Sequence, residues 1–313
     1  MNMEAFILGV GGTMPLPNRH LTSVLLRREG EVFLFDAGEG TQVSLRALNL
    51  KWKKISAILI SHTHADHVTG LPGMLMLSSQ VDREEPLYVI GPPRIAEYVE
   101  SNRAALEMYI NFEIRVREIE DPRQPQPVFQ GDGYSIHAFP LRHSRVCVGY
   151  TLVEEDRPGL FFPDRAEEAG VPRGPLWSRL QAGESVNLSD GRTVSPDQVM
   201  GPSRRGRKFS YMTDTLPLDS VLPHIANSDV LISEGMFTEE HRETARAKKH
   251  MTAADAARLA MRAGGIGRMG LIHYSPRFTN RQLKDLLREA QAVFPNSFLT
   301  RDRMHIDIPY QEE

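Results

Sequence analysis

One short segment constrains the fold more than any other part of the 313-residue sequence: Ser61-His62-Thr63-His64-Ala65-Asp66-His67. It follows an apolar stretch at residues 55–60, which is short and rich in β-branched side chains and therefore predicts a buried strand. Residues two apart on an extended chain share a face, so His62 and His64 are expected to point to one place. Asp66 and His67 follow where the strand must turn. Four such side chains after a buried strand predict a metal site, with two pairs offset enough to serve two ions.

Composition limits the class of protein. The chain is 41% hydrophobic and 25% charged with a net charge of −3, so any polyanion must be bound by local basic patches. No apolar run approaches the ~20 residues of a membrane span, and residues 1–6 lack the basic start of a secretory signal. The single cysteine, Cys147, excludes an internal disulfide and suits a reducing compartment. We therefore expect a cytoplasmic protein that does not act at a membrane.

A predicted strand followed by a metal-type side chain recurs along the chain. The residues in these positions are Asp66 with His67, Asp214, Glu234 and His273. Helices are expected between the strands, at residues 68–79, 94–111 and 252–263, the last capped by Thr252. Strands alternating with helices predict an α/β fold, an αββα sandwich with a site along one edge of its sheets.

Two turns near the start of the chain are relevant to cofactor binding and to support of residues 61–67, which we call the metal loop. Gly11-Gly12-Thr13 follows the first predicted strand, but there is no GxGxxG pattern and no Walker lysine, which argues against a nucleotide cofactor. Asp36 follows a later strand and either supports the metal loop by hydrogen bonds or accepts from nearby turn amides. The sequence leaves both interpretations of Asp36 open.

Residues 155–203 interrupt this order, because they are rich in proline, glycine and charge and show little sustained apolar period. Within a compact domain, such a long irregular stretch is typical of a functional or protruding insertion. We therefore expect a single domain over residues 1–313, with an inserted, protruding, flexible arm at 155–203.

These residues resemble a known family. His62-Thr63-His64-Ala65-Asp66-His67 is similar to the motif of the metallo-β-lactamase superfamily. The longer form, which continues through Gly70-Leu71-Pro72-Gly73, resembles ribonuclease Z, the endonuclease that matures tRNA 3′ ends. The similarity runs from residue 11 to about residue 278. Departures at Ala65, Thr213 and Pro276 keep each ligand and alter a neighbour, so they bear on rate and substrate range rather than on metal binding.

The resemblance implies a binuclear metal site. The implied ligands are His62, His64 and His143 for one ion and Asp66, His67 and His273 for the other, with Asp214 bridging both. This mixture of imidazole and carboxylate suits zinc best, with manganese as the alternative. Two divalent ions can acidify a bridging water and stabilise the negatively charged transition state of phosphodiester hydrolysis.

The resemblance also implies which residues handle protons and RNA. Asp66 would orient the attacking water, and Glu234 with His250 would form a proton-donating pair for the leaving 3′-oxygen. Residues expected to contact RNA are Arg19, Gly174 and Pro175 of the arm, and the basic run Arg204, Arg205, Arg207 and Lys208.

The expected function is that of a metal-dependent endoribonuclease, which removes the 3′ trailer from precursor tRNA and leaves a 3′-hydroxyl on the tRNA. A homodimer, in which one subunit's arm presents tRNA to the other's active site, is implied by the family. Two alternatives remain. A small-molecule phosphodiesterase or other binuclear hydrolase of the same fold usually needs no such arm. A non-catalytic RNA-binding relative would be expected to have lost ligands, and all seven are retained here.

Overall fold

The computed structural model describes residues 2–81 and 83–311, and the chain divides into two compact units. Unit 2 is the stretch Val153–Arg207, and unit 1 is formed by the described residues before and after it. The segment expected as an inserted arm, residues 155–203, lies inside unit 2.

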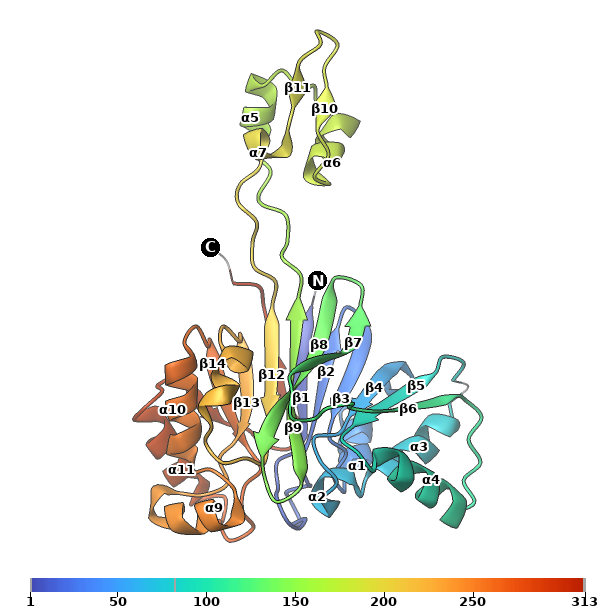
Figure 1. Ribbon diagram of the computed structural model, residues 1–313, viewed down its shortest axis with the longest axis vertical. Helices are drawn as coiled ribbons and strands as arrows, with labels where there is room; N and C mark the ends of the chain where they lie inside the picture. The colour runs from blue at the N-terminus through green and yellow to red at the C-terminus, as the bar shows by residue number, and fades with distance from the viewer. Residues whose placement is uncertain (1, 82, 312–313) are drawn as a thin grey trace. The chain divides into compact units, whose positions relative to one another are not determined.

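Unit 1 contains two seven-stranded sheets among the described residues (Figure 1). The first has the order β16-β1-β2-β3-β4-β5-β6, with β1 (Met3–Gly9), β2 (Ser23–Arg28), β3 (Glu31–Phe35), β4 (Ile55–Leu59), β5 (Leu87–Gly91), β6 (Ile114–Glu118) and β16 (Met304–Asp307). The second has the order β15-β14-β13-β12-β9-β8-β7, with β7 (Gln126–Gly131), β8 (Tyr134–Arg142), β9 (Val146–Glu154), β12 (Lys208–Met212), β13 (Val230–Glu234), β14 (Arg268–Ile272) and β15 (Ser297–Leu299). Strands β3 to β6 are parallel to one another, as are β12 to β15.

Most strands of the two sheets are apolar on both faces, as expected when each face is covered. The inner faces of the two sheets pack against each other and form one core. Phe35 of β3 illustrates the packing: its ring centroid lies 5.4 Å from that of Phe209 and 5.6 Å from that of Tyr211, both on β12. All three rings are fully buried. A second apolar cluster joins the first sheet to the helices on its other side.

Helices cover the outer faces of both sheets (Figure 1). The helices of unit 1 are α1 (Thr41–Ala47), α2 (Ala65–Val68), α3 (Leu71–Ser79), α4 (Ile95–Ala105), α8 (Leu222–Ile225), α9 (Arg242–Lys248), α10 (Ala253–Ala263) and α11 (Leu283–Gln291), with short 3₁₀ turns at Trp52–Lys54, Asp219–Val221 and Glu239–His241. Buried residues of α1, α3 and α4 pack on the first sheet, while α10 and α11 contact the second. No helix in the described part of the chain is both long and apolar enough to cross a membrane. The α/β sandwich predicted from the sequence is confirmed.

Helix boundaries differ from the prediction in two places. The helix expected at residues 68–79 starts only at Leu71, because Gly70 packs on the loop after β3: its amide donates to the Ala37 carbonyl oxygen at 2.8 Å, and a Cβ there would lie 2.2 Å from the Gly38 carbonyl oxygen. The helix expected at residues 94–111 ends at Ala105, and Glu107 beyond it has a left-handed backbone (φ 46°). By contrast, α10 begins after Thr252, whose side chain accepts from the Asp255 amide, as predicted.

Unit 2 has a small core of its own. Its elements are α5 (Pro163–Glu168), α6 (Pro175–Gln181), β10 (Val186–Asn187), β11 (Thr193–Val194) and α7 (Pro196–Val199). Six small and medium apolar side chains are buried among them: Ala166, Val171, Leu180, Val186, Val194 and Val199. This stretch is therefore a folded subdomain, although its sequence shows no sustained apolar period.

The carboxyl ends of the parallel strands lie at one edge of each sheet in unit 1. Asp36 follows β3, the His62–His67 loop follows β4, and Asp214 follows β12. Glu234 ends β13 and His273 follows β14. Parallel pairing therefore gathers polar side chains from widely separated parts of the chain at one place.

Candidate metal and active site

The predicted ligands come from four separate chain segments of unit 1. His62 and His64 lie in the loop after β4, Asp66 and His67 lie on the single turn α2, and His143 lies between β8 and β9. Asp214 and His273 follow β12 and β14. All of them except His64 are buried.

His62, His64, His143 and Asp214 form the first group of potential ligands, with one ligand atom from each within 4.8 Å of the others. Nδ1 of His64 lies 3.0 Å from Nε2 of His62 and 3.2 Å from Nε2 of His143. Oδ2 of Asp214 faces the same point, 3.6 Å from His62 Nε2 and 3.5 Å from His143 Nε2.

Asp66, His67 and His273 form the second group. Nε2 of His273 lies 3.2 Å from Nε2 of His67 and 3.3 Å from Oδ2 of Asp66. Oδ1 of Asp214 lies 3.4 Å from His67 Nε2 and 3.3 Å from His273 Nε2. Asp214 therefore presents one carboxylate oxygen to each group.

The spacing of these atoms fits divalent ions. Zinc binds imidazole nitrogen and carboxylate oxygen at about 2.0–2.2 Å in a tetrahedron, so neighbouring ligand atoms should lie about 3.3–3.5 Å apart. Most neighbouring ligand atoms in both groups lie 3.0–3.6 Å apart, and His67 Nε2 lies 3.8 Å from Asp66 Oδ2, all close to that value. Several pairs are ring nitrogens facing each other, an arrangement that imidazoles alone satisfy poorly and that a shared cation explains.

Asp36 holds the metal loop from behind. Its buried carboxylate accepts from the amide and the hydroxyl of Ser61, from the Tyr211 hydroxyl and from Nδ1 of His67, each at 2.7 Å. The Asp36–His67 bond fixes the ring so that Nε2 points into the second ligand group. Both interpretations left open by the sequence therefore apply, since Asp36 binds a loop amide and a ligand ring together.

The charged side chains of the site shift one another's pKa values. Burial alone would raise the pKa of Asp214, but His273 and His67 outweigh it and hold that pKa well below its usual range. Burial opposes the charge on His67, yet Asp214, Asp36 and Asp66 raise its pKa well above the ordinary value. Burial and His67 together lower the pKa of His62. The carboxylates therefore stay ionised, which is the state that metal ligands require.

Glu234 and His250 lie beside these groups. Glu234 is fully buried and accepts from the Thr215 amide at 2.6 Å and the Met251 amide at 3.2 Å. Its Oε2 lies 3.2 Å from Nδ1 of His250. Burial lowers the pKa of His250, but Glu234 and Asp214 outweigh it and raise that pKa to about 9. Glu234 thus keeps a proton on Nδ1 of His250.

Helix α9 connects this pair to His143. Lys249 ends the helix in a left-handed conformation (φ 58°), and its carbonyl oxygen lies 3.0 Å from Nδ1 of His143. The imidazole of His143 therefore donates from Nδ1 and turns Nε2 toward the first ligand group. The centroids of the His143 and His250 rings are 4.9 Å apart.

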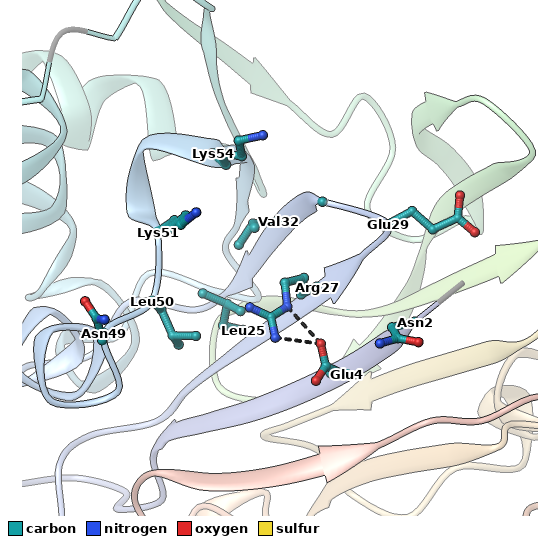
Figure 2. A pocket seen from close by; sticks show the side chains of 11 residues that line it. Asn2, Glu4, Leu25, Arg27, Glu29, Val32, Asn49, Leu50, Lys51 and Lys54 are labelled. Carbon is teal, nitrogen blue, oxygen red and sulfur yellow. Dashed lines mark hydrogen bonds and ion pairs between the residues drawn. The ribbon is translucent and has the colours of Figure 1, made fainter.

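An open cavity of 490 Å³ lies over the ligands and is bordered by Lys248 and Lys249. Another cavity of unit 1, of 390 Å³, lies near the start of β1 and β3 (Figure 2). Its polar lining includes the Arg27–Glu4 ion pair, Lys51 and Lys54, with no cluster of metal-type side chains among its lining residues. Of these two cavities, only the one over the ligands combines metal-type side chains, a histidine that can donate a proton and surface cations.

Two predicted RNA contacts are corrected by the structure. Arg19 is 4% exposed, and its guanidinium donates to the carbonyl oxygens of Ser275 and Phe278 and to the side chain of Asn280. Arg207 is 1% exposed and donates to both carboxylate oxygens of Glu154 at 2.8 Å. Both arginines are structural, because a buried guanidinium that is already hydrogen-bonded cannot also meet a phosphate.

The other residues expected to contact RNA are at least partly accessible. Lys208 is half-buried and donates to the Ala226 carbonyl oxygen, and Arg204 is half-buried and donates to the Pro158 carbonyl oxygen. Arg205, Gly174 and Pro175 are exposed in unit 2. These positions do not by themselves identify an RNA contact.

The sequence missed several supporting residues. Tyr211 and Ser61 bind Asp36, and the Lys249 carbonyl orients His143. A tyrosine inside a buried strand gives no sequence signal of this role, and a backbone carbonyl gives none at all. Ser61, directly before the first ligand, was the one position at which local sequence offered a hint.

Comparison with known proteins is consistent with this geometry. A family model described as "Anti-Pycsar protein Apyc1" matches residues 3–153, which include His62 to His143 and exclude Asp214, His250 and His273. Two solved structures share the fold. They are human tRNase Z, short form (TM-score 0.70, 23% identity, covering 98% of this chain and 99% of that one), and the metallo-β-lactamase fold protein YhfI from Bacillus subtilis (TM-score 0.68, 18% identity, covering 98% and 100%).

A relative of much higher sequence identity settles the family. The protein named ribonuclease Z from Treponema pallidum (strain Nichols) is 59% identical over 312 residues, covering 100% of this chain and 99% of its own. The chain belongs to the ribonuclease Z family and has the metallo-β-lactamase fold.

Proposed function

We propose that this protein is a metal-dependent endoribonuclease that removes the 3′ trailer from precursor tRNA. The reaction hydrolyses one phosphodiester, leaves a 3′-hydroxyl on the tRNA and releases the 3′ trailer with a 5′-phosphate. Membership in the ribonuclease Z family and the chemistry of the buried site both support this activity. A cytoplasmic location is part of the proposal, because precursor tRNA is the substrate.

The ligand groups would hold two divalent ions, with zinc favoured by the imidazole content and manganese as the alternative. His62, His64 and His143 would bind one ion, Asp66, His67 and His273 the other, and Asp214 both. Bound ions would supply an acidified water and neutralise charge on the phosphate. The carboxylate of Asp214, with one oxygen facing each group, is the observation that carries a binuclear assignment.

Asp66 would orient the attacking water. Its Oδ2 accepts from the Thr13 amide at 2.6 Å and faces His273, so that oxygen is fixed in position. Its other oxygen, Oδ1, has no hydrogen-bond partner among residues 2–81 and 83–311, which leaves it available to accept from a water.

His250 would protonate the leaving 3′-oxygen. Its Nδ1 is held by Glu234, so the opposite ring nitrogen, Nε2, is left to present a proton toward the cavity. Cations bound beside it would oppose the raised pKa and bring it toward the range useful for general acid catalysis. A ribose 3′-oxygen is a poor leaving group without a proton, so this role should matter most for RNA.

Unit 2 would grip the tRNA away from the cleavage site. Gly174 has φ 145° and open space at its Cβ position, and Arg173, which is also paired with Glu167, lies over the Trp177 ring at 5.6 Å from its centroid. A guanidinium stacked on an aromatic ring next to a bare glycine backbone is a surface suited to phosphates and sugars.

The proposal includes a homodimer in which unit 2 of one subunit serves the other's active site. Light scattering should then give twice the 35.3 kDa chain mass.

The test compares a 3′-extended precursor tRNA with a small aryl phosphodiester, using wild type and Asp66→Ala with zinc or manganese. We expect a single cut near the discriminator base, lost in Asp66→Ala. Turnover of the small diester with intact precursor tRNA would reject the tRNA assignment and leave a small-molecule hydrolase of the same fold.

A further inference from the structure

A second groove adjoins the metal ligands and has no role in the mechanism described so far. It has a volume of 450 Å³ and is lined by Thr63, Pro93, Arg94, Glu97, Tyr98, Ser101, Arg145 and Val146. One side is the start of α4, and the other is the turn between β8 and β9. We call it the α4 groove.

The α4 groove shares a wall with the ligand groups. Thr63 lies between the ligands His62 and His64 in the chain, and Arg145 and Val146 come two and three residues after His143. Ser144, which borders the main cavity, has its hydroxyl 3.4 Å from Nε2 of His64. The two cavities are therefore lined by adjacent residues at two places, Thr63 beside His64 and Arg145 beside Ser144.

His250 lines the main cavity over the ligands and is not among the residues that line the α4 groove. The ring of His143 is next to both His64 and His250, with its centroid 4.9 Å from each of theirs. If His250 protonates the 3′-oxygen that stays on the tRNA, the tRNA end lies near His250. The nucleotide on the other side of the cut, the first of the trailer, then lies toward the α4 groove.

Arg145 is the cation available in this groove. It is exposed, and within the described part of the chain it has no hydrogen bond or ion pair. Arg94, the other arginine, is bound to the carboxylate of Glu97 at 2.9 and 3.2 Å. The first amides of α4 are also occupied, because the Glu118 carboxylate accepts from Arg94 and Ala96. A phosphate in the groove would therefore meet Arg145, whose planar fork suits bidentate binding.

The remaining surface suits a nucleobase of any sequence. Val146 is 50% exposed although it is apolar, and the Tyr98 ring is fixed by a hydrogen bond of 2.9 Å from its hydroxyl to the Val68 carbonyl oxygen. Any base can stack on an aromatic ring and contact an apolar side chain, so such a site suits trailers of varied sequence.

We propose that the α4 groove is the binding site for the first trailer nucleotide, with Arg145 on the phosphate at its 3′ side and the base against Tyr98 and Val146. This inference rests on the proposed function and on the role of His250 within it. It assigns to Arg145 a part in substrate binding that does not involve the metal ligands.

The test uses precursor tRNAs with a two-nucleotide trailer, in which the linkage between the two trailer nucleotides is either a phosphate or a neutral methylphosphonate. We expect neutralisation to lower kcat/KM of wild type by about tenfold, the scale of one charge-assisted contact. Arg145→Ala should lose about the same factor on the phosphate substrate and show no further loss on the neutral one. Arg145→Lys should recover part of the rate. The small aryl diester should be hydrolysed equally by all variants.

The control variant is Arg123→Ala, whose side chain is 88% exposed and lies outside the groove. It should behave as wild type on every substrate. If Arg145→Ala keeps the full tenfold response to neutralisation, or cleaves the phosphate substrate at the wild-type rate, the α4 groove is not the trailer site. Wild type that hydrolyses the aryl diester but cuts neither precursor would instead refute the proposed function.

Discussion

The buried carboxylate of Asp36 offers the sharpest test of how the fold builds the metal centre. Asp36→Asn preserves the shape and the left-handed backbone, since φ is 54° at this position and asparagine tolerates that region. The side-chain N–H₂ of asparagine, however, must take the place of one of the two carboxylate oxygens of Asp36. Oδ1 accepts from the Ser61 amide, and Oδ2 accepts from the Ser61 hydroxyl, Tyr211 and His67. In either orientation the amide N–H₂ faces a donor.

The expected loss follows from these contacts. A hydrogen bond to a charged group contributes about 1.5–3 kcal/mol, and a buried donor left unpaired costs about as much again. We therefore expect Asp36→Asn to destabilise unit 1 by about 3 kcal/mol or more, which lowers the melting temperature by roughly 6–12 °C. Loss of the acceptor for His67 should also weaken metal binding about 10–100-fold.

The assay is competition for zinc against a chromogenic chelator, together with thermal unfolding of the metal-loaded and chelated protein. Asp302→Asn is the matched control, because that carboxylate also accepts two amides, from Val10 and His20, and contacts no metal ligand. Wild-type zinc affinity in Asp36→Asn, or a melting temperature lowered no more than in the control, would refute the role assigned to Asp36.

Three further predictions concern His250 as a proton donor, the charge of His250 and its effect on stability, and unit 2. His250→Ala should lower kcat on precursor tRNA by about 10²–10⁴-fold and much less on a nitrophenyl diester, whose leaving group needs no proton; equal losses on both substrates would contradict the general-acid role. In chelated protein, the folded-state pKa of His250, about 9, exceeds its unfolded value of about 6.5. Its contribution of about 3 kcal/mol is then fully present below pH 6.5 and lost as pH rises through 9, so urea titrations should show this fall in wild type relative to His250→Gln. Replacing residues 155–203 by a short linker should abolish precursor tRNA cleavage and spare the aryl diester, and parallel loss of both would show that unit 2 is structural.

Burial explains why two charged residues were misjudged from the sequence. Arg19 and Arg207 stand next to loops and basic runs that resemble RNA-contacting segments, so their charge suggested phosphates. In the fold, Arg19 holds the chain after His273, and Arg207 pairs with Glu154 inside unit 2. Local charge density does not reveal which cations have a partner elsewhere in the chain.

The sequence by itself determined the local half of the metal site. His62, His64, Asp66 and His67 lie within six residues after an apolar strand, and the alternation of an extended chain followed by a turn is enough to bring them together. The strand-and-helix order also determined the α/β class. Asp214 and His273 were singled out by the recurring strand-end pattern, but their assignment to particular ions, and the part of His143, came only from the family resemblance, because these residues lie in other segments.

Only the tertiary structure decided how the distant residues meet. Asp214 and His273 reach the loop after β4 because two sheets stack and their parallel strands end at one edge, and His143 reaches it from the turn between β8 and β9. Asp36 and Tyr211 come from facing sheets, 175 residues apart, to hold one histidine ring. Such contacts depend on strand pairing and sheet packing, which are set by the whole core and not by any neighbouring residues in the chain.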